Sequence, residues 1–547
     1  MKKKKTYWKN IEQIDKESSL IEDIENKEFA NQLPVNKILL TQEGLESENT
    51  SRRDFLKYVG FSTSAAALAA CEGPVIKSVP YVVQPEQIRP GIANYYATAI
   101  ADGFDFASIL VKTREGRPIK IESNKEAPDL GSANARVHAS VLSLYDTKRI
   151  QLPKINGKDS SWDVLKSGVL SDLNSVSQKQ GKVVLLTQTF ASPTTSKIIK
   201  DLVTKFPNIE HIILDTVPSN YAVESFQDAY GFEGLLDYDF TKSDFIVSVD
   251  ADFLGDWQGG GYDTKYVRNR VPDKKTGNGR MSKHVQFEAN MTLTGANADI
   301  RVPAKPTEQK KILSYIYSAV KGLNSKVKLS PEHKKSAKFA VDGIKKFGSK
   351  AVIVSGLDDK KIQDLILDLN NHIKSLAIDN SARLTRTQSG NEVDIFINEL
   401  LDGKISGLIA VGVNPVYSLS SGEKIKNAIS NLDFSLSFSM KEDETSSVCK
   451  YIAAVPHYLE SWGDYEFKEG HYFLAQPTIR PLFNTMQFQD FVLSIIGSSK
   501  DYYATIKAFW KQNVLNGKSW NKVLHDGFYK RSKKEKLKFN PKKNIVL

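Results

Sequence analysis

The residues that could hold a metal or a redox cofactor are few, and thiols are the scarcest. The chain of 547 residues contains two cysteines, Cys71 and Cys449. A 4Fe-4S cluster needs four thiolate ligands, and haem c attachment needs a C-x-x-C-H motif, so neither can form within this chain. We therefore expect any iron–sulfur or haem carrier on a partner or on a continuation of the polypeptide. Cys449 precedes an apolar stretch, where a lone cysteine is typically a buried hydrophobic side chain.

A pair of aspartates follows one predicted strand. Asp250 and Asp252 come directly after the apolar residues 245–249, and a glycine triplet, residues 259–261, lies a few positions further on. Ligand sites of α/β proteins lie at such strand ends, and glycine lets a backbone approach a cofactor closely. The alternative is that these residues only cap and turn the chain, and we favour this structural interpretation.

A second polar group combines two carboxylates with a histidine. Glu460 and Asp464 flank Trp462, with His457 nearby. Such a cluster could relay protons. More often these groups satisfy one another's hydrogen bonds in a loop, and we favour that interpretation. Three other histidines show no spacing typical of zinc ligands: His138, His284 and His471. We predict no catalytic, cofactor-binding or metal-binding residue in this chain.

An export signal is the strongest motif in the sequence. Arg52 and Arg53 form a twin-arginine pair inside S-R-R-x-F-L-K, and a mildly apolar run ends at L-A-A-C with Cys71. Twin-arginine signals address folded proteins for export across a bacterial inner membrane. The L-A-A-C ending resembles a lipobox, in which the cysteine is lipidated and becomes the new N-terminus. The alternative is a short buried helix that contains two arginines.

The apolar part of this signal is too short to span a membrane. Only 13 residues separate Lys57 from Cys71, whereas a transmembrane helix needs about 20. We therefore expect a water-soluble mature chain, anchored by lipid on the periplasmic face of the inner membrane. A single short acyl chain anchors weakly, so stable attachment needs further chains or a protein partner.

The net charge of +11 is unevenly distributed along the chain. Residues 1–70 contain 11 Lys+Arg and 11 Asp+Glu, whereas residues 505–547 contain 12 Lys+Arg and 2 Asp+Glu. The last segment thus carries +10, and the rest of the mature chain is near neutral. A basic tail favours an acidic protein surface or anionic lipid as partner, and nucleic acid is not expected for an exported protein. A solvated end without a partner is the alternative.

Short apolar strands alternate with helical segments along most of the chain. Strands are predicted at residues 183–186, 211–214, 245–249, 351–354 and 407–411. Helices are predicted at residues 138–145, 195–206, 221–230 and 361–374, and from Trp162 onward. This alternation is typical of the α/β class with doubly wound, mostly parallel sheets and flanking helices. Residues 108–113 and 118–121, with a turn at Glu115 and Gly116, predict a small N-terminal β-hairpin region.

Several sequence blocks resemble the molybdopterin oxidoreductase superfamily. Residues 116–122 (GRPIKIE) resemble its G-R-P-x-K-I-E hairpin, and residues 138–146, 148–153 and 161–162 resemble the blocks that follow it. Later blocks resemble a narrower group, the large periplasmic iron–sulfur subunit of alternative complex III, a bacterial respiratory quinol oxidoreductase. These blocks are residues 248–254, 294–299, 414–417, 443–445, 459–464 and 476–481. The leader before Arg52 resembles the extended twin-arginine translocation domain found in front of molybdopterin and iron–sulfur subunits.

The resemblance also identifies what this chain lacks. Catalytic relatives bind a 4Fe-4S cluster through a C-x-x-C-x-x-x-C run near the mature N-terminus, but residues 91–107 contain no cysteine. They ligate molybdenum through Cys, selenocysteine, Ser or Asp after the first sheet unit, where this chain offers only Ser219, Ser225 and Asp228. In alternative complex III the corresponding domain is understood to be empty of pterin and metal. The resemblance therefore implies a scaffold without a cofactor of its own.

The predicted organisation has four parts: an extended leader with the signal at residues 1–70, a tether and hairpin region at 71–160, molybdopterin-enzyme-like α/β domains at 161–500 and a basic tail at 501–547. The predicted function is a periplasmic, non-catalytic scaffold subunit of a respiratory quinol:electron-acceptor oxidoreductase. Implied partners are a multihaem cytochrome c subunit, a ferredoxin-like 4Fe-4S domain or subunit, and quinol-binding integral membrane subunits. Two alternatives stay open: a catalytic molybdenum oxidoreductase of the polysulfide or thiosulfate reductase type, and an independent periplasmic binding lipoprotein.

Overall fold

The computed structural model describes residues 91–103, 105–127, 132–271, 281–324, 326–387, 391–531 and 537–540. These residues all belong to one compact unit, Pro85–Leu547. The predicted twin-arginine pair, Arg52 and Arg53, and the predicted lipidation site, Cys71, lie outside the described residues. Among the described residues, no helix is both long and apolar enough to cross a membrane.

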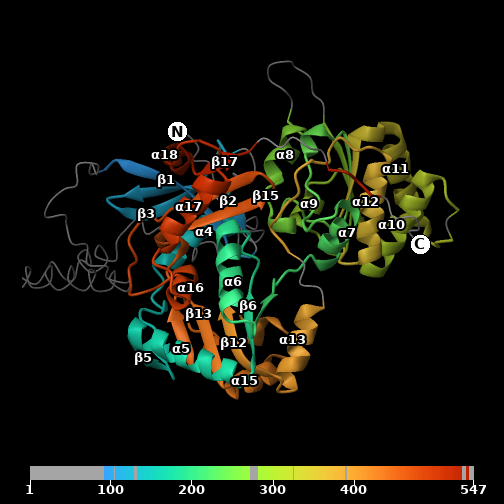
Figure 1. The fold of residues 1–547 in the computed structure, drawn as a ribbon. Helices are drawn as coiled ribbons and strands as arrows, with labels where there is room; N and C mark the ends of the chain where they lie inside the picture. The colour runs from blue at the N-terminus through green and yellow to red at the C-terminus, as the bar shows by residue number, and fades with distance from the viewer. Residues whose placement is uncertain are drawn as a thin grey trace, which may run out of the picture. The chain divides into compact units, whose positions relative to one another are not determined.

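The larger sheet has seven strands in the order β5-β4-β14-β13-β12-β6-β7 (Figure 1). Its parallel strands are β6 (Lys182–Thr187), β7 (Ile209–Ile213), β12 (Ile405–Val411), β13 (Phe434–Ser439) and β14 (Tyr451–Ala454). A short hairpin, β4 (Lys154–Ile155) and β5 (Lys158–Asp159), adds an antiparallel edge. The helices of this part are α5 (Trp162–Gln178), α6 (Pro193–Lys205), α13 (Glu392–Leu401), α14 (Pro415–Ser418), α15 (Gly422–Ser430), α16 (Phe488–Ile496) and α17 (Tyr502–Asn513).

Alternate side chains of β6 show that both faces of this sheet are buried. Val183 and Leu185 lie in one apolar cluster with residues of α5, α6, α16 and α17. Val184 and Leu186 lie in another cluster with residues of α13 and α15. A strand that is covered on both faces has apolar residues at successive positions, whereas a strand with one exposed face alternates apolar and polar residues.

The smaller parallel sheet has four strands in the order β10-β9-β8-β11. These are β8 (Phe245–Val249), β9 (Lys283–Glu288), β10 (Ile300–Pro303) and β11 (Ala351–Ser355). Helices α10 (Pro306–Lys321), α11 (Pro331–Phe347) and α12 (Lys360–His372) share an apolar cluster with one side of the sheet. Helix α7 (Asn220–Tyr230) and a group of aromatic rings share a cluster with the other side. Two short helices, α8 (Asp263–Arg268) and α9 (Leu293–Ala296), follow β8 and β9.

Two antiparallel sheets complete the described part. The first is β1 (Ala93–Ala101), β2 (Phe106–Arg114) and β3 (Arg117–Ser123), with α4 (Ala135–Leu144) packed against it. The second is β15 (Gly463–Lys468), β16 (His471–Ala475) and β17 (Phe528–Lys530), and α18 (Trp520–Asp526) comes directly before β17 in the chain. Short 3-10 turns are η3 (Phe240–Lys242), η4 (Trp257–Gly259), η5 (Gly348–Lys350), η6 (Ser446–Val448) and η7 (Tyr458–Glu460).

The predicted hairpin is present, with its turn at the predicted residues. Strands β2 and β3 pair antiparallel, and Glu115 and Gly116 between them have φ of 51° and 76°. Positive φ at both central residues is what a two-residue turn needs to match the twist of the flanking strands. The α/β class with doubly wound, mostly parallel sheets and flanking helices is likewise confirmed.

Part of the basic C-terminal segment is folded. Residues 502–530 form α17, α18 and β17, and Trp510 of α17 is fully buried. The lysine count does not reveal this, because lysines occupy the exposed sides of helices whose other sides are apolar. The domain boundaries expected from the sequence stay predictions.

Candidate functional site

Both parallel sheets reverse their strand order once, and a crevice opens at each reversal. The reversal lies between β6 and β12 in the seven-stranded sheet and between β8 and β11 in the four-stranded sheet. Doubly wound folds bind ligands at such points, beyond the carboxyl ends of the strands. A cavity of about 230 Å³ lies at the first reversal and one of about 190 Å³ at the second. Both are smaller than the roughly 300–1,000 Å³ of typical small-molecule sites.

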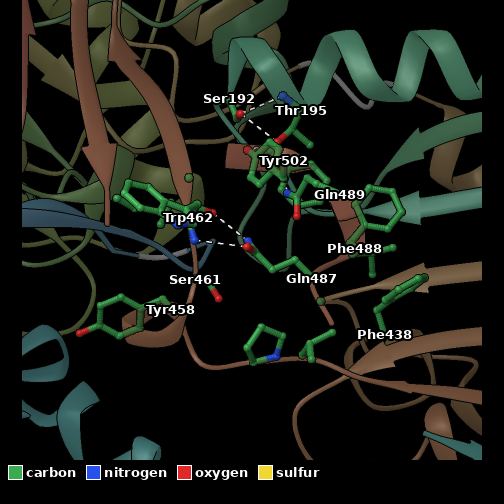
Figure 2. Close-up of a pocket in the computed structure, with 18 of the residues that line it drawn as sticks. Ser192, Thr195, Phe438, Tyr458, Ser461, Trp462, Gln487, Phe488, Gln489 and Tyr502 are labelled. Carbon is green, nitrogen blue, oxygen red and sulfur yellow. Dashed lines mark hydrogen bonds between the residues drawn. The ribbon is translucent and has the colours of Figure 1, made fainter. Parts of the chain in front are cut away.

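The first crevice, shown in Figure 2, is lined by aromatic and amide side chains. Phe190 stacks on Phe488 with ring centroids 6.0 Å apart, and Phe438 meets Phe488 edge to face at 5.2 Å. The Gln487 side chain is held by the backbone of Trp462: its Oε1 accepts a hydrogen bond from the N–H at 3.2 Å, and its Nε2 donates to the carbonyl at 2.7 Å. Among the described residues that line this crevice, none has a charged side chain. The crevice therefore offers no cation to a phosphate.

A buried carboxylate lies at the N-terminus of α6, the helix that follows β6. Asp464 accepts hydrogen bonds from the hydroxyls of Ser192 at 2.7 Å and Thr194 at 2.6 Å. It also accepts them from Trp510 Nε1 at 2.9 Å and from the Thr194 backbone N–H. Burial raises the pKa of Asp464, and these hydrogen bonds oppose the rise. A doubly wound fold places a ligand's phosphate at such a helix N-terminus; here the position is taken by the protein's own Asp464.

The second crevice is rich in carboxylates. Its charged lining residues are Asp250, Asp252, Asp256, Asp358 and the buried Arg386. Asp358 accepts a hydrogen bond from the Tyr221 backbone N–H in the first turn of α7, so this helix N-terminus also binds a carboxylate of the protein. Burial raises the pKa of Asp358 and of Asp250. Four carboxylates against one guanidinium make this crevice unfavourable for a phosphate.

The two aspartates singled out from the sequence both line the second crevice, and both have structural partners. Asp252 Oδ1 accepts hydrogen bonds from the Thr294 backbone N–H at 3.0 Å and from its hydroxyl at 2.6 Å, which fixes the start of α9. Asp250 has φ of 59°, and a Cβ on Gly356 would lie 2.0 Å from the Asp250 carbonyl oxygen. Two chain segments thus meet closely after β8 and β11. These contacts support the structural interpretation of Asp250 and Asp252.

A charged network that sequence reasoning missed holds the glycine triplet in place. Arg383 donates hydrogen bonds to the carbonyls of Gln258 at 3.0 Å and Gly260 at 2.5 Å. Asp237 pairs with Arg383 at 3.1 Å and with Lys468 at 2.7 Å, and all three charged side chains are buried. Burial disfavours the charged form of Asp237, yet the two cations hold its pKa well below the usual range. The partners of Arg383 lie more than 120 residues away in sequence, so no local signal could have identified them.

The three candidate molybdenum ligands do not come together at one site. Ser219 lines the second crevice. Ser225 is fully buried, and its hydroxyl donates to the Lys360 carbonyl at 3.3 Å. Asp228 pairs with Lys360 Nζ at 2.6 Å. Ser225 and Asp228 therefore serve the packing of α7 on α12, and of the three candidates only Ser219 lines one of the two crevices.

The predicted carboxylate–histidine cluster contains a partner that the sequence did not reveal. Arg149 pairs with Glu460 at 2.6 Å, and both side chains are fully buried. Glu460 Oε2 also accepts a hydrogen bond from the His457 backbone N–H at 2.8 Å. Burial lowers the pKa of His457 to about 4, so its imidazole is neutral near pH 7. Asp464 binds a different set of partners, as described above. Glu460 and His457 thus hydrogen-bond to each other within the loop, whereas Asp464 does not join them.

The remaining candidate ligands are also structural. Cys449 is buried, its Sγ donates to the Thr445 carbonyl at 3.3 Å, and burial raises its pKa to about 12. His138 Nδ1 lies 2.7 Å from the Ile121 carbonyl oxygen, and His284 is fully buried beside Tyr266. Within the described ranges, no group of three His, Cys, Asp or Glu side chains is arranged to hold a metal ion.

The residues at the two crevices do not fit a pterin dinucleotide, the cofactor that the resemblance implies for catalytic relatives. Such a cofactor carries a pyrophosphate, which helix N-termini and cations bind in α/β folds. Here Asp464 and Asp358 bind the N-termini of α6 and α7. The first crevice has no cationic lining residue, and the second has one cation among four carboxylates. We derive no chemical step through this cofactor.

Comparisons with known proteins agree with this fold. No family model matches the chain. The chain is 22% identical over 515 residues to the menaquinone reductase, molybdopterin-binding-like subunit of Nitratidesulfovibrio vulgaris, covering 82% of this chain and 72% of the relative. Acetylene hydratase from Pelobacter acetylenicus shares its fold with a TM-score of 0.62 at 12% identity, over 80% of this chain and 74% of that chain. The predicted resemblance to the molybdopterin oxidoreductases is thus confirmed, and the chain has the fold of the molybdopterin enzymes.

Proposed function

We propose that this chain is a non-catalytic, molybdopterin-enzyme-like scaffold subunit of a membrane-bound respiratory complex that exchanges electrons with a quinone. One observation carries the proposal: the helix N-termini at both crevices bind the protein's own carboxylates, Asp464 and Asp358. Because carboxylates of the protein occupy these helix N-termini, they are not available to bind the pyrophosphate of a pterin dinucleotide, although the fold and its surfaces remain. A relative whose name includes menaquinone reductase and "molybdopterin-binding-like subunit" supports the respiratory part of the proposal.

The proposed complex is alternative complex III or a close counterpart. The motivating features are the sequence blocks that resemble its large periplasmic subunit and the shortage of cysteines. Electrons would pass through 4Fe-4S clusters and haem c on other polypeptides or on a continuation of this one, with quinol-binding integral membrane subunits alongside. The twin-arginine pair, Arg52 and Arg53, would direct export of the folded chain, and lipidated Cys71 would anchor it at the periplasmic face.

The first test is the cofactor content of the full chain. The chain is produced in a bacterium that makes molybdopterin, together with a catalytic molybdopterin enzyme that reports cofactor supply. Molybdenum is measured by mass spectrometry and pterin by the fluorescence of its oxidised form. We expect the control enzyme to be loaded and this chain to carry neither. Stoichiometric molybdenum with pterin in this chain would overturn the proposal.

The second test concerns the partners. Affinity purification of the full chain from detergent-solubilised membranes of its own bacterium should recover haem-containing and quinone-binding subunits, identified by haem staining and mass spectrometry. Recovery of the chain alone, under conditions that preserve other respiratory complexes, would instead favour an independent binding lipoprotein.

A further inference from the structure

Positive and negative charges are unevenly distributed within residues 71–504, although their sum is near zero. Residues 301–350 contain 13 Lys+Arg and 3 Asp+Glu, a net charge of +10. Residues 71–504 as a whole carry only +1, so the remainder of that stretch is acidic by 9 charges. The basic segment comprises most of β10 and all of α10 and α11, on one side of the four-stranded sheet. Its charge is therefore concentrated on one part of the fold.

Helix α11 presents the densest part of this charge, which we call the lysine face: Lys334, Lys335, Lys338, Lys345 and Lys346. All five residues are exposed, while Ala337, Ala340, Val341 and Ile344 turn toward the core. With 100° between successive residues, the five lysines occupy an arc of about 120°. Asp342 is the only acidic residue within that arc. None of the five lysines forms an ion pair with a carboxylate of the described residues.

Lys334 and Lys335, near the N-terminus of α11, do not help the helix to fold, because the helix dipole disfavours cations there. Lys334 and Lys338 are four residues apart, and Lys335 and Lys338 are three apart, so they repel one another on the helix surface. Glutamate at either spacing would stabilise the helix instead. Phe339 lies beside these lysines and is 37% exposed. An exposed aromatic ring among cations without carboxylate partners is typical of a protein surface that binds anionic head groups lying over an apolar layer.

The type of cation favours a lipid over a protein partner. Twelve of the 13 cations in residues 301–350 are lysine, and the exception, Arg301, is paired with the buried Glu288. Protein interfaces are enriched in arginine, whose planar fork binds carboxylates in two-point fashion, and depleted in lysine. Lysine is a hydrated point charge, which suits the diffuse negative charge of a phospholipid surface. We propose that the lysine face of α11 binds the anionic phospholipid surface of a membrane. This proposal does not depend on the proposed function.

The test measures binding of the full chain to vesicles. Cys71→Ser prevents lipidation, and sedimentation with phosphatidylcholine vesicles is compared with an equimolar phosphatidylcholine–phosphatidylglycerol mixture. Each lysine near an anionic surface changes the partition coefficient about fivefold. Replacing Lys334, Lys335 and Lys338 by glutamine should therefore weaken binding about 100-fold. Binding should also disappear in 1 M salt, where the screening length falls to about 3 Å.

The matched control removes the same charge from elsewhere on the fold. Lys158→Gln, Lys200→Gln and Lys424→Gln are three exposed positions on β5, α6 and α15. This triple should leave vesicle binding within about threefold of the parent, since β5, α6 and α15 belong to the seven-stranded sheet, whereas α11 packs on the four-stranded sheet. Circular dichroism verifies that each variant is folded. If the first triple is unstable, Lys338→Gln, Lys345→Gln and Lys346→Gln test the same face.

Three outcomes would overturn the proposal. The first is no binding of the folded parent chain to anionic vesicles at low salt. The second is an equal loss in the control triple, which would make net charge alone responsible. The third is salt-sensitive binding to polyglutamate without binding to vesicles, which would identify an acidic protein as the partner.

Discussion

The hydrogen bond from Trp510 to Asp464 tests whether the buried Asp464 carboxylate at the start of α6 contributes to stability. Trp510→Phe keeps an aromatic ring in the core but removes the Nε1–H that donates to Asp464 at 2.9 Å. A hydrogen bond to a charged group contributes about 1.5–3 kcal/mol. The smaller ring adds roughly 1 kcal/mol for lost packing. The free energy of unfolding should fall by about 2.5–4 kcal/mol.

Trp520→Phe is the matched control, because Trp520 packs edge to face against Trp510 at 6.1 Å. Its Nε1 is buried, and no hydrogen-bond partner for it exists among the described residues. This change removes a similar volume but no hydrogen bond, so we expect a loss of about 1 kcal/mol or less. Urea titrations at pH 7, followed by circular dichroism, give both values from the midpoints and slopes. Equal losses in the two variants would refute the assigned role of the Asp464 hydrogen bonds.

The pH dependence of the same pair gives an independent check. The Trp510 donor favours the ionised form of Asp464, whose pKa burial has raised. Removing the donor raises that pKa further, so the penalty of Trp510→Phe is largest at pH values where Asp464 is ionised in the native protein. The penalty should shrink as the pH falls through the folded-state pKa. A penalty that stays constant from pH 7 to pH 4 would contradict the argument.

Three further predictions concern other buried groups. Arg149→Ala leaves Glu460 charged and unpaired in the core, so the free energy of unfolding should fall by about 3–5 kcal/mol, whereas Arg149→Met with Glu460→Leu should recover most of it in urea titrations. Burial lowers the pKa of His284 to about 4, below the unfolded value of about 6.5. Its contribution to the free energy of unfolding should therefore be complete above pH 6.5 and decrease toward pH 4 by about 1.4 kcal/mol per pH unit. The decrease should be smaller in His284→Gln, as measured by urea titrations at each pH. Burial raises the pKa of Cys449 to about 12, so in a Cys71→Ser background a thiol reagent should react slowly in buffer and rapidly in urea; equal rates would contradict its burial.

The regular elements could be predicted from the sequence because their signals are local. The apolar run at residues 245–249 became β8, and the Glu115–Gly116 turn joins β2 to β3 with positive φ at both residues. Helix ends were less accurate: the helix expected at residues 195–206 begins at Pro193, because Ser192 caps it two residues earlier. The cysteine count needs no structure either: two cysteines are too few for the four thiolate ligands of a 4Fe-4S cluster.

The sequence by itself thus determined the α/β class and the hairpin. Only the tertiary structure decided what the polar residues do. Asp464 and Glu460 are four residues apart, yet one binds the start of α6 and Trp510 while the other pairs with Arg149, 311 residues away. The physical reason is that periodicity and turn chemistry act between neighbours in sequence. The partner of a buried carboxylate is set instead by which distant strands and helices the topology brings together.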